Sequence, residues 1–206
     1  MGVLTATIPK PLLPNPNNSL IRHQIDLLRH HVNFLYVTAG YQKENLKRGL
    51  AEFEVDAVID VEGHGNAFFI NSLQDIPEES RTLVITCDNL MNIDLALLAS
   101  EAKSHNSSLI VPKVTSKQTT GDFIEHQDGL ISAMRRRTGV GAVASGLQVL
   151  HANDIKSLRK ESVDDFSEAW EYLIERKSLR ISKTPVESWW AIDTEDALNQ
   201  WLNSDG

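Results

Sequence analysis

The sequence is poor in the features on which secreted, membrane-spanning and nucleic-acid-binding proteins rely. It has a single cysteine, Cys87, which excludes an intramolecular disulfide. Acidic residues outnumber basic ones by 28 to 20, so the formal charge of −8 argues against a nucleic-acid or membrane-surface partner. No apolar run approaches the length of a membrane span, and the first residues do not resemble a signal peptide. We therefore expect a cytoplasmic protein.

What remains is the composition of an ordinary globular protein. Hydrophobic residues make up 41% of the chain and charged residues 23%, and 206 residues suit one domain with a sizeable core. Expected strands and helices alternate as far as about residue 115, which predicts parallel strands joined by helical crossovers. Gln127-Asp128-Gly129 then separates two alternating runs and predicts a β-hairpin. The predicted fold is α/β, with a mostly parallel sheet, a small β-hairpin insertion and a single domain spanning 1–206.

Hydrophobic spacing places the individual elements along the chain. It predicts helices at 19–31, 42–53, 66–76, 93–103, 164–177 and 194–202. It predicts strands at 32–40, 56–61, 81–89, 107–114, 141–151 and 189–192. Asn17, Asn18 or Ser19 has the right position and side chain to cap the first helix.

Two aspartates follow expected strands. Asp88 ends the run LVITCD, and Asp193 ends WWAID. In open parallel sheets ligands bind beyond the carboxyl ends of the strands, and two converging carboxylates are suitable ligands for Mg²⁺. The alternative is that each residue, or its neighbour, merely caps the helix that follows, and spacing alone favours this simpler interpretation.

Lys10 and a glycine pair complete the set of candidate residues. Lys10 lies between Pro9 and Pro11, so a stiff loop presents its ammonium group, which suits either phosphate binding or an ordinary exposed turn. Gly63 and Gly65 stand at an expected strand-to-helix junction, where the backbone can approach an anion or a flat ring closely. A plain turn explains these glycines equally well.

The order of these motifs resembles the sugar-phosphate nucleotidyltransferase superfamily, whose members join an NTP to a phosphorylated sugar or alcohol and release pyrophosphate. The resemblance extends over 4–202 and rests on PKPLLP, CDN, ASGLQVL and WWAIDTEDAL in this order. It implies a Rossmann-like three-layer sandwich with Mg²⁺ as cofactor, and a place in sugar nucleotide biosynthesis. The implied partners are an NTP and a phosphorylated acceptor, a sugar 1-phosphate first and phosphocholine second, and a homo-oligomer is compatible with the sequence.

The resemblance also implies a role for each candidate residue. Lys10 would contact phosphates, and Asp88 and Asp193 would hold Mg²⁺. The residues near the base would be Gly65 and Asn66, and those at the acceptor would be Gly146 and, as a weaker candidate, Lys113. A surface lysine at the end of a strand is an equally good interpretation of Lys113.

The sequence departs from the superfamily at its beginning. Members have a central strand and a Gly-rich loop before the segment that here begins with Met1, so we expect an N-terminally shortened nucleotidyltransferase-like domain. Met1 would then be an internal methionine of a longer reading frame, or the chain is a naturally shortened relative. The second case keeps open an alternative function, a non-catalytic module that binds a nucleotide or sugar phosphate.

Overall fold

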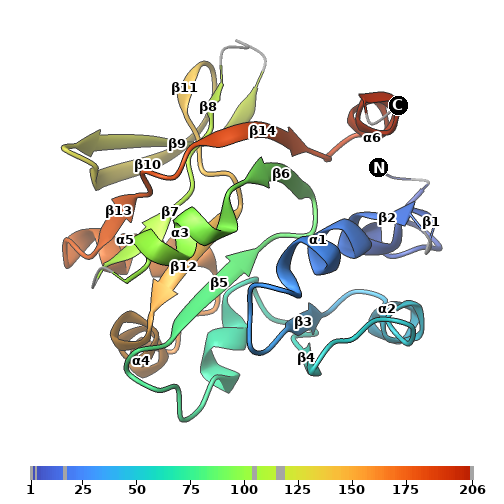
Figure 1. The fold of residues 1–206 in the computed structure, drawn as a ribbon, viewed down its shortest axis with the longest axis horizontal. Coiled ribbons are helices and arrows are strands. Elements are labelled where there is room, and N and C mark those ends of the chain that lie inside the picture. Colours follow the sequence, from blue (N-terminus) through green and yellow to red (C-terminus); the bar gives the residue numbers. More distant parts are fainter. Residues whose placement is uncertain (1, 3, 16–17, 104–105, 115–118, 205–206) are drawn as a thin grey trace. The chain divides into compact units, whose positions relative to one another are not determined.

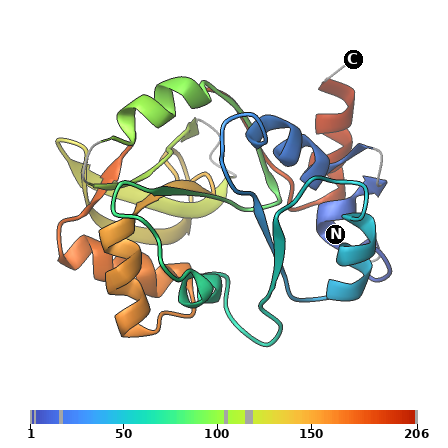
Figure 2. The ribbon, with the colours of Figure 1, turned by 60° about the horizontal axis from the view of Figure 1, so that its bottom comes forward.

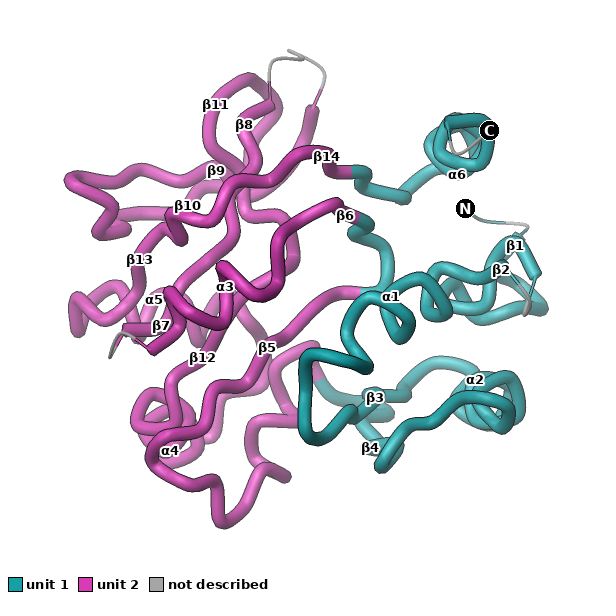
Figure 3. Tube along the Cα trace, viewed as in Figure 1, with its two compact units in different colours: residues 1–64, 87–90, 190–206 teal, residues 65–86, 91–189 magenta. Residues whose placement is uncertain are grey.

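The computed structural model describes residues 2, 4–15, 18–103, 106–114 and 119–204, drawn as a ribbon in Figure 1. The chain divides into two compact units (Figure 3). Unit 1 comprises Met1–His64, Cys87–Leu90 and Trp190–Gly206, and unit 2 comprises Gly65–Thr86 and Met91–Trp189. The single-domain organisation expected from the sequence stays a prediction.

Unit 1 is built around helices and a short parallel sheet. Its elements are the 3₁₀ helix η1 (Lys10–Leu12), strands β1 (Pro14–Asn15), β2 (Asn18–Ser19), β3 (Tyr36–Ala39) and β4 (Ala57–Asp60), and helices α1 (Leu20–Leu28), α2 (Lys43–Gly49) and α6 (Glu195–Ser204). Strands β3 and β4 pair in parallel. Helix α1 begins after Ser19, whose hydroxyl accepts a hydrogen bond from the amide of Arg22 at 3.3 Å, so the sequence-predicted capping role falls to Ser19.

The core of unit 1 joins residues that are far apart in the sequence. One cluster of its buried side chains is formed by Leu13, Leu20, Leu90, Ile192, Leu198 and Trp201. These side chains come from all three chain segments of the unit. The chain passes between the units within β6 (Asn89–Ile93) and β14 (Val186–Ala191), which pair with each other.

Unit 2 contains a six-stranded sheet in the order β5-β12-β7-β13-β10-β9. These strands are β5 (Arg81–Ile85), β7 (Ser107–Leu109), β9 (Thr120–Gln127), β10 (Leu130–Thr138), β12 (Leu147–His151) and β13 (Leu179–Ile181). Helix α3 (Leu95–Glu101) lies on one face of the sheet, and α4 (Ala152–Glu161) and α5 (Phe166–Glu175) lie on the other (Figure 2). Unit 2 also contains the short strands β8 (Lys113–Val114) and β11 (Gly141–Ala142), which pair antiparallel, and the 3₁₀ helix η2 (Phe68–Ser72).

The α/β class predicted from the sequence is confirmed, but the sheet is mixed rather than mostly parallel. Strands β7 and β13 pair in parallel, whereas β12 runs antiparallel to both β5 and β7, and β10 runs antiparallel to both β13 and β9. Strands β5 and β7 run in the same direction, as alternation predicts, but β12, from later in the chain, lies between them and runs antiparallel to both. The predicted hairpin at Asp128-Gly129 is confirmed as β9 and β10, and it forms one edge of this sheet rather than a separate insertion.

Two further predictions from the sequence are wrong in detail. The helix expected at 66–76 is the single short 3₁₀ helix η2, because its apolar residues fill the core without a helical stripe. The strand expected at 81–89 is two strands, β5 and β6, with Asp88 between them. In the described part of the chain, no helix is long and apolar enough to cross a membrane.

Candidate functional site

Lys10, Asp88 and Asp193 meet in unit 1. The Lys10 ammonium donates to Asp88 Oδ2 at 2.7 Å and to Asp193 Oδ1 at 3.0 Å. The side chains of Lys10 and Asp88 are 24% and 27% exposed, whereas that of Asp193 is 72% exposed. The structure therefore brings together three residues that are distant in the sequence, around one cation and with one side open to solvent.

A short, stiff segment positions Lys10. The flanking prolines restrict the backbone, and the amides of Leu12 and Leu13 donate to the carbonyls of Pro9 and Lys10 at 2.9 and 3.1 Å. Leu12 and Leu13 are buried, at 5% and 2% exposure, and anchor the segment directly after Lys10 and Pro11. The lysine backbone is thus fixed while its side chain reaches the two carboxylates.

Asp88 and Asp193 are held next to each other by the backbone. The amide of Ile192 donates to the carbonyl oxygen of Asp88 at 2.8 Å, which joins the two segments directly in front of Asp193. Ile192 is fully buried in the unit 1 core. The side-chain amide of Asn89 donates to Asp88 Oδ1 at 3.0 Å and orients this carboxylate, while Gln24 of α1 donates to the carbonyl oxygen of Asn89 at 3.1 Å.

Neither aspartate is itself a helix cap, although Thr194, the neighbour of Asp193, is one, as the simpler interpretation allowed. Asp88 is followed by strand β6, and the cap of α3 is Asp94, whose carboxylate accepts from the amide of Leu97 at 2.9 Å. At the start of α6 the hydroxyl of Thr194 accepts from the amide of Ala197 at 3.1 Å, so Thr194 performs the capping there. The Asp193 carboxylate points to Lys10 instead.

The electrostatics of the cluster favour a charged lysine. Burial disfavours the ammonium ion, but the hydrogen bonds and charges of Asp88 and Asp193 outweigh it, so the pKa of Lys10 is raised above its ordinary value. Desolvation, reinforced by the Asp88 carboxylate, raises the pKa of the adjacent Cys87 to about 12. Cys87 is therefore a protonated thiol at neutral pH and a poor nucleophile.

The donor set of Asp88 and Asp193 fits a Mg²⁺ ion. Both carboxylates already converge on a single positive charge, and Mg²⁺ favours one or two carboxylates with water and substrate phosphates completing its shell. In the described ranges of the chain, no group of three or more His, Cys, Asp and Glu side chains could hold a metal ion. A magnesium ion at this pair would take its other ligands from water and phosphate oxygens.

Gly65 and Asn66, the residues expected near the base, belong to unit 2 and contact the start of α5. The amide of Gly65 donates to Asp164 Oδ2 at 2.9 Å, and Asn66 Oδ1 accepts from the amide of Phe166 at 2.9 Å. A Cβ atom on Gly65 would collide with the carbonyl group of Asp164. Close packing thus accounts for the glycine, and a role of either residue in nucleotide binding stays a prediction.

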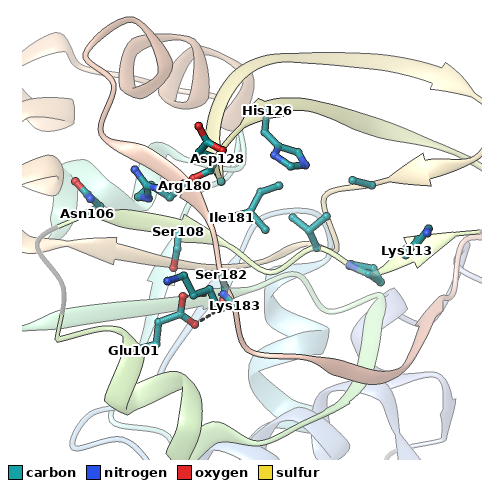
Figure 4. Close-up of a pocket in the computed structure, with 14 residues that line it drawn as sticks. Glu101, Asn106, Ser108, Lys113, His126, Asp128, Arg180, Ile181, Ser182 and Lys183 are labelled. Carbon is teal, nitrogen blue, oxygen red and sulfur yellow. Dashed lines mark hydrogen bonds between the residues drawn. The ribbon is translucent and has the colours of Figure 1, made fainter.

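Lys113 and Gly146, the residues expected at the acceptor, also belong to unit 2 but do not line the same pocket. Lys113 lines a cavity of about 750 Å³ together with His126, Arg180 and Lys183 (Figure 4). Gly146 is not among the residues that line this cavity, and its carbonyl oxygen accepts from the amide of Thr86 at 3.0 Å. The positive φ of Gly146, 76°, explains why glycine is favoured there.

Some residues of these two sites escaped the sequence reasoning. Asn89 orients Asp88, and its only signal was its position directly after the aspartate. Arg180 lies within β13 and Lys183 lies just beyond its end, and both line the same cavity as Lys113. No motif marks either residue, because the fold alone brings β13 next to the segment around Lys113.

Known proteins share this fold. No protein-family model matches the chain. Among solved structures, the CTP:phosphocholine cytidylyltransferase LicC of Streptococcus pneumoniae is similar with a TM-score of 0.74 and 15% identity, covering 98% of this chain and 92% of its own. The inositol-1-phosphate CTP transferase of T. maritima has a TM-score of 0.75 and 16% identity, and the match covers 99% of this chain and 88% of that protein. A candidate glucose-1-phosphate thymidylyltransferase of Bacillus anthracis has a TM-score of 0.77 and 16% identity, and the match covers 97% of this chain and 87% of that protein. The chain therefore has the fold of the sugar-phosphate nucleotidyltransferases.

Proposed function

We propose that this protein is a nucleotidyltransferase that joins an NTP to a phosphorylated acceptor and releases pyrophosphate in a Mg²⁺-dependent reaction. The observation that carries the proposal is the meeting of Lys10, Asp88 and Asp193 around one point, in a chain with the nucleotidyltransferase fold. A sugar 1-phosphate is the proposed acceptor. The next acceptors to test are phosphocholine and inositol 1-phosphate, which appear in the names of two enzymes with similar structures.

The reaction places few demands on proton transfer. An oxygen of the acceptor phosphate attacks the α-phosphorus of the NTP and forms the new P–O bond. The bond from the α-phosphorus to the oxygen that bridges it to the β-phosphate breaks, and pyrophosphate leaves with the electron pair. Because the attacking oxygen is already an anion, no strong general base is needed, and positioning and charge stabilisation account for catalysis.

The cluster in unit 1 supplies residues for both tasks. Lys10 would donate hydrogen bonds to phosphate oxygens and stabilise the negative charge that develops during transfer. Asp88 and Asp193 would hold Mg²⁺, which supplies positive charge that offsets the repulsion between the two phosphate groups. Asn89, hydrogen bonded to Asp88, would keep one oxygen of this carboxylate in a fixed direction.

The proposal is tested by pyrophosphate release from the purified chain. The four common NTPs are each combined with a panel of sugar 1-phosphates, inositol 1-phosphate and phosphocholine, with Mg²⁺ or with EDTA. Release with one pair and Mg²⁺, and none with EDTA, is the expected result and would identify the substrates. A folded protein that is silent across the whole panel would contradict the proposal and favour a non-catalytic binding module.

The Asp88→Asn variant tests the role of the cluster directly. We expect it to lower turnover at least about a hundredfold, because an amide of the same size cannot supply the charged oxygen that would hold Mg²⁺ beside the phosphates. The initial rate of pyrophosphate release measures the effect. The matched control is Asp26→Asn, which removes an exposed carboxylate on α1 that pairs with Arg22 at 3.6 Å. Turnover that is equal in wild type and Asp88→Asn would exclude Asp88 from the mechanism.

A further inference from the structure

The Lys10 ammonium occupies the position at which Asp88 and Asp193 converge. It lies 2.7 Å from Oδ2 of Asp88 and 3.0 Å from Oδ1 of Asp193, so the two carboxylate oxygens cannot be further apart than the sum of these distances. Two carboxylates this close repel each other, and the ammonium offsets that repulsion. A cation that used both oxygens would have to take the place of this lysine.

The backbone of Lys10 is held in place while its side chain can rotate, so the ammonium group can move away without a change in the fold. The backbone of Lys10 is fixed by the neighbouring prolines and by the buried side chains of Leu12 and Leu13. The side chain, in contrast, has four rotatable bonds and ends beside Asp193, which is largely exposed. Movement of the ammonium group therefore needs rotation about side-chain bonds only.

We propose that Lys10 is an internal counter-ion that competes with the divalent cation for Asp88 and Asp193. This inference rests on the proposed function, in which the two carboxylates hold Mg²⁺. A metal ion arriving alone must displace the ammonium and leave it close to a second positive charge. A polyphosphate that arrives with the metal gives the ammonium new oxygen partners, so metal and polyphosphate bind with positive coupling.

The test measures metal binding without nucleotide, acceptor or turnover. Mn²⁺ serves as the probe, and the free ion is quantified by electron paramagnetic resonance during titration of the protein. We expect Lys10→Met to bind Mn²⁺ at least about tenfold more tightly than wild type, because the variant no longer places a positive charge between the two carboxylates. Lys10→Arg keeps the charge and is expected to bind as weakly as wild type.

Two controls separate the proposed competition from a general charge effect. Lys47→Met removes one positive charge from α2 in the same unit, where Lys47 pairs with Glu44 at 3.2 Å, and is expected to leave Mn²⁺ affinity within about twofold of wild type. The double variant Lys10→Met with Asp193→Asn is expected to lose the gain. If Lys10→Met does not fold, as judged by circular dichroism, Lys10→Gln provides the same neutralisation with a polar side chain.

The outcomes distinguish this proposal from the proposed function. An unchanged or lower Mn²⁺ affinity in a folded Lys10→Met or Lys10→Gln variant would overturn the competition, even if the wild type releases pyrophosphate. A gain that depends on Asp193 would support it, even if the wild type is inactive on every substrate pair. A gain of equal size in Lys47→Met would also overturn it, because the effect would then follow net charge alone.

Discussion

At the scale of single residues, Gly65 shows how packing and function can account for the same sequence feature. The sequence suggested that this glycine lets the backbone approach a ligand. In the structure the space where its Cβ would lie is filled by the backbone carbonyl of Asp164, and the Gly65 amide donates to the Asp164 carboxylate. The glycine is therefore required by a contact within unit 2.

We expect Gly65→Ala to destabilise the protein by about 1 to 3 kcal/mol, as is typical when an added methyl group must displace backbone. Chemical denaturation followed by circular dichroism measures the change. Gly40→Ala is the matched control, because the nearest atom to its added Cβ is 3.6 Å away, an ordinary contact. Equal stability of Gly65→Ala and wild type would show that the turn adjusts without cost and that packing does not explain the glycine.

The sequence predicts which residues form the cluster, namely Lys10, Asp88 and Asp193. The spacing of the two aspartates along the chain does not, by itself, predict that they meet. Chemistry at strand ends suggested the carboxylates, yet spacing alone favoured two helix caps. The caps are Asp94, which lies further along the chain than expected, and Thr194, which directly follows Asp193 and was already an alternative. A capping residue is recognised by where its helix starts, and sequence patterns locate helix starts only to within a few residues.

At the scale of elements, Glu101 fixes the end of α3 to the turn that follows β13. One carboxylate oxygen accepts from the Ser182 hydroxyl at 2.6 Å and from the Thr184 hydroxyl at 2.8 Å. The backbone amides of Lys183 and Thr184 donate to the same carboxylate at 2.7 and 3.1 Å. Burial disfavours the ionised form, but these four bonds outweigh it, so the pKa of Glu101 is lowered from its ordinary value.

Glu101 should therefore stabilise the protein in a pH-dependent manner. A carboxyl group whose pKa is lower in the folded state contributes stability that is present in full above its unfolded-state value, here 4.5, and is lost as the pH falls through the folded-state pKa. We expect Glu101→Gln to cost about 1 to 3 kcal/mol at neutral pH, because a charged acceptor of several bonds is removed. As the pH falls below 4.5, the difference between wild type and variant should shrink.

Urea denaturation of both proteins between pH 3 and 7 measures this difference. Glu171→Gln provides the control, since it makes the same chemical change at an exposed position of α5. The control should show neither the loss at neutral pH nor its disappearance in acid. A Glu101→Gln cost that is the same at every pH would contradict a role for the charge.

The elements themselves were predicted unevenly, for physical reasons that particular segments illustrate. The β9–β10 hairpin and helix α5 were predictable because their signals are local: a two-residue Asp128-Gly129 turn with positive φ, and an amphipathic stripe after the cap Asp165. The direction of β12 was not, because its neighbours β5 and β7 come from a distant part of the chain. Helix η2 was overpredicted because a short apolar run fits a buried irregular turn as well as a helix.

At the scale of the whole molecule, the two units differ in how the chain builds them. Unit 1 is assembled from three separate segments, and its core brings together Leu13 and Leu20 from the first, Leu90 from the second, and Ile192, Leu198 and Trp201 from the third. Hydrophobic periodicity is a local property and cannot reveal a core built from distant segments. This explains why the sequence shows no sign that the chain divides into two compact units. The same assembly places Lys10, Asp88 and Asp193 together, one from each segment.

Leu198→Ala tests whether this core holds unit 1 together. Leu198 is 3% exposed, and truncation of a buried leucine costs about 2 to 5 kcal/mol through lost burial and the cavity left behind. We expect hydrogen exchange, followed by mass spectrometry, to accelerate in all three segments of unit 1, including the one that carries Lys10. The matched control is Leu158→Ala on α4, a fully buried leucine of unit 2, which should accelerate exchange within 91–189 instead. Acceleration by Leu198→Ala that is confined to α6, or that is uniform over both units, would show that the three segments do not form one cooperative core.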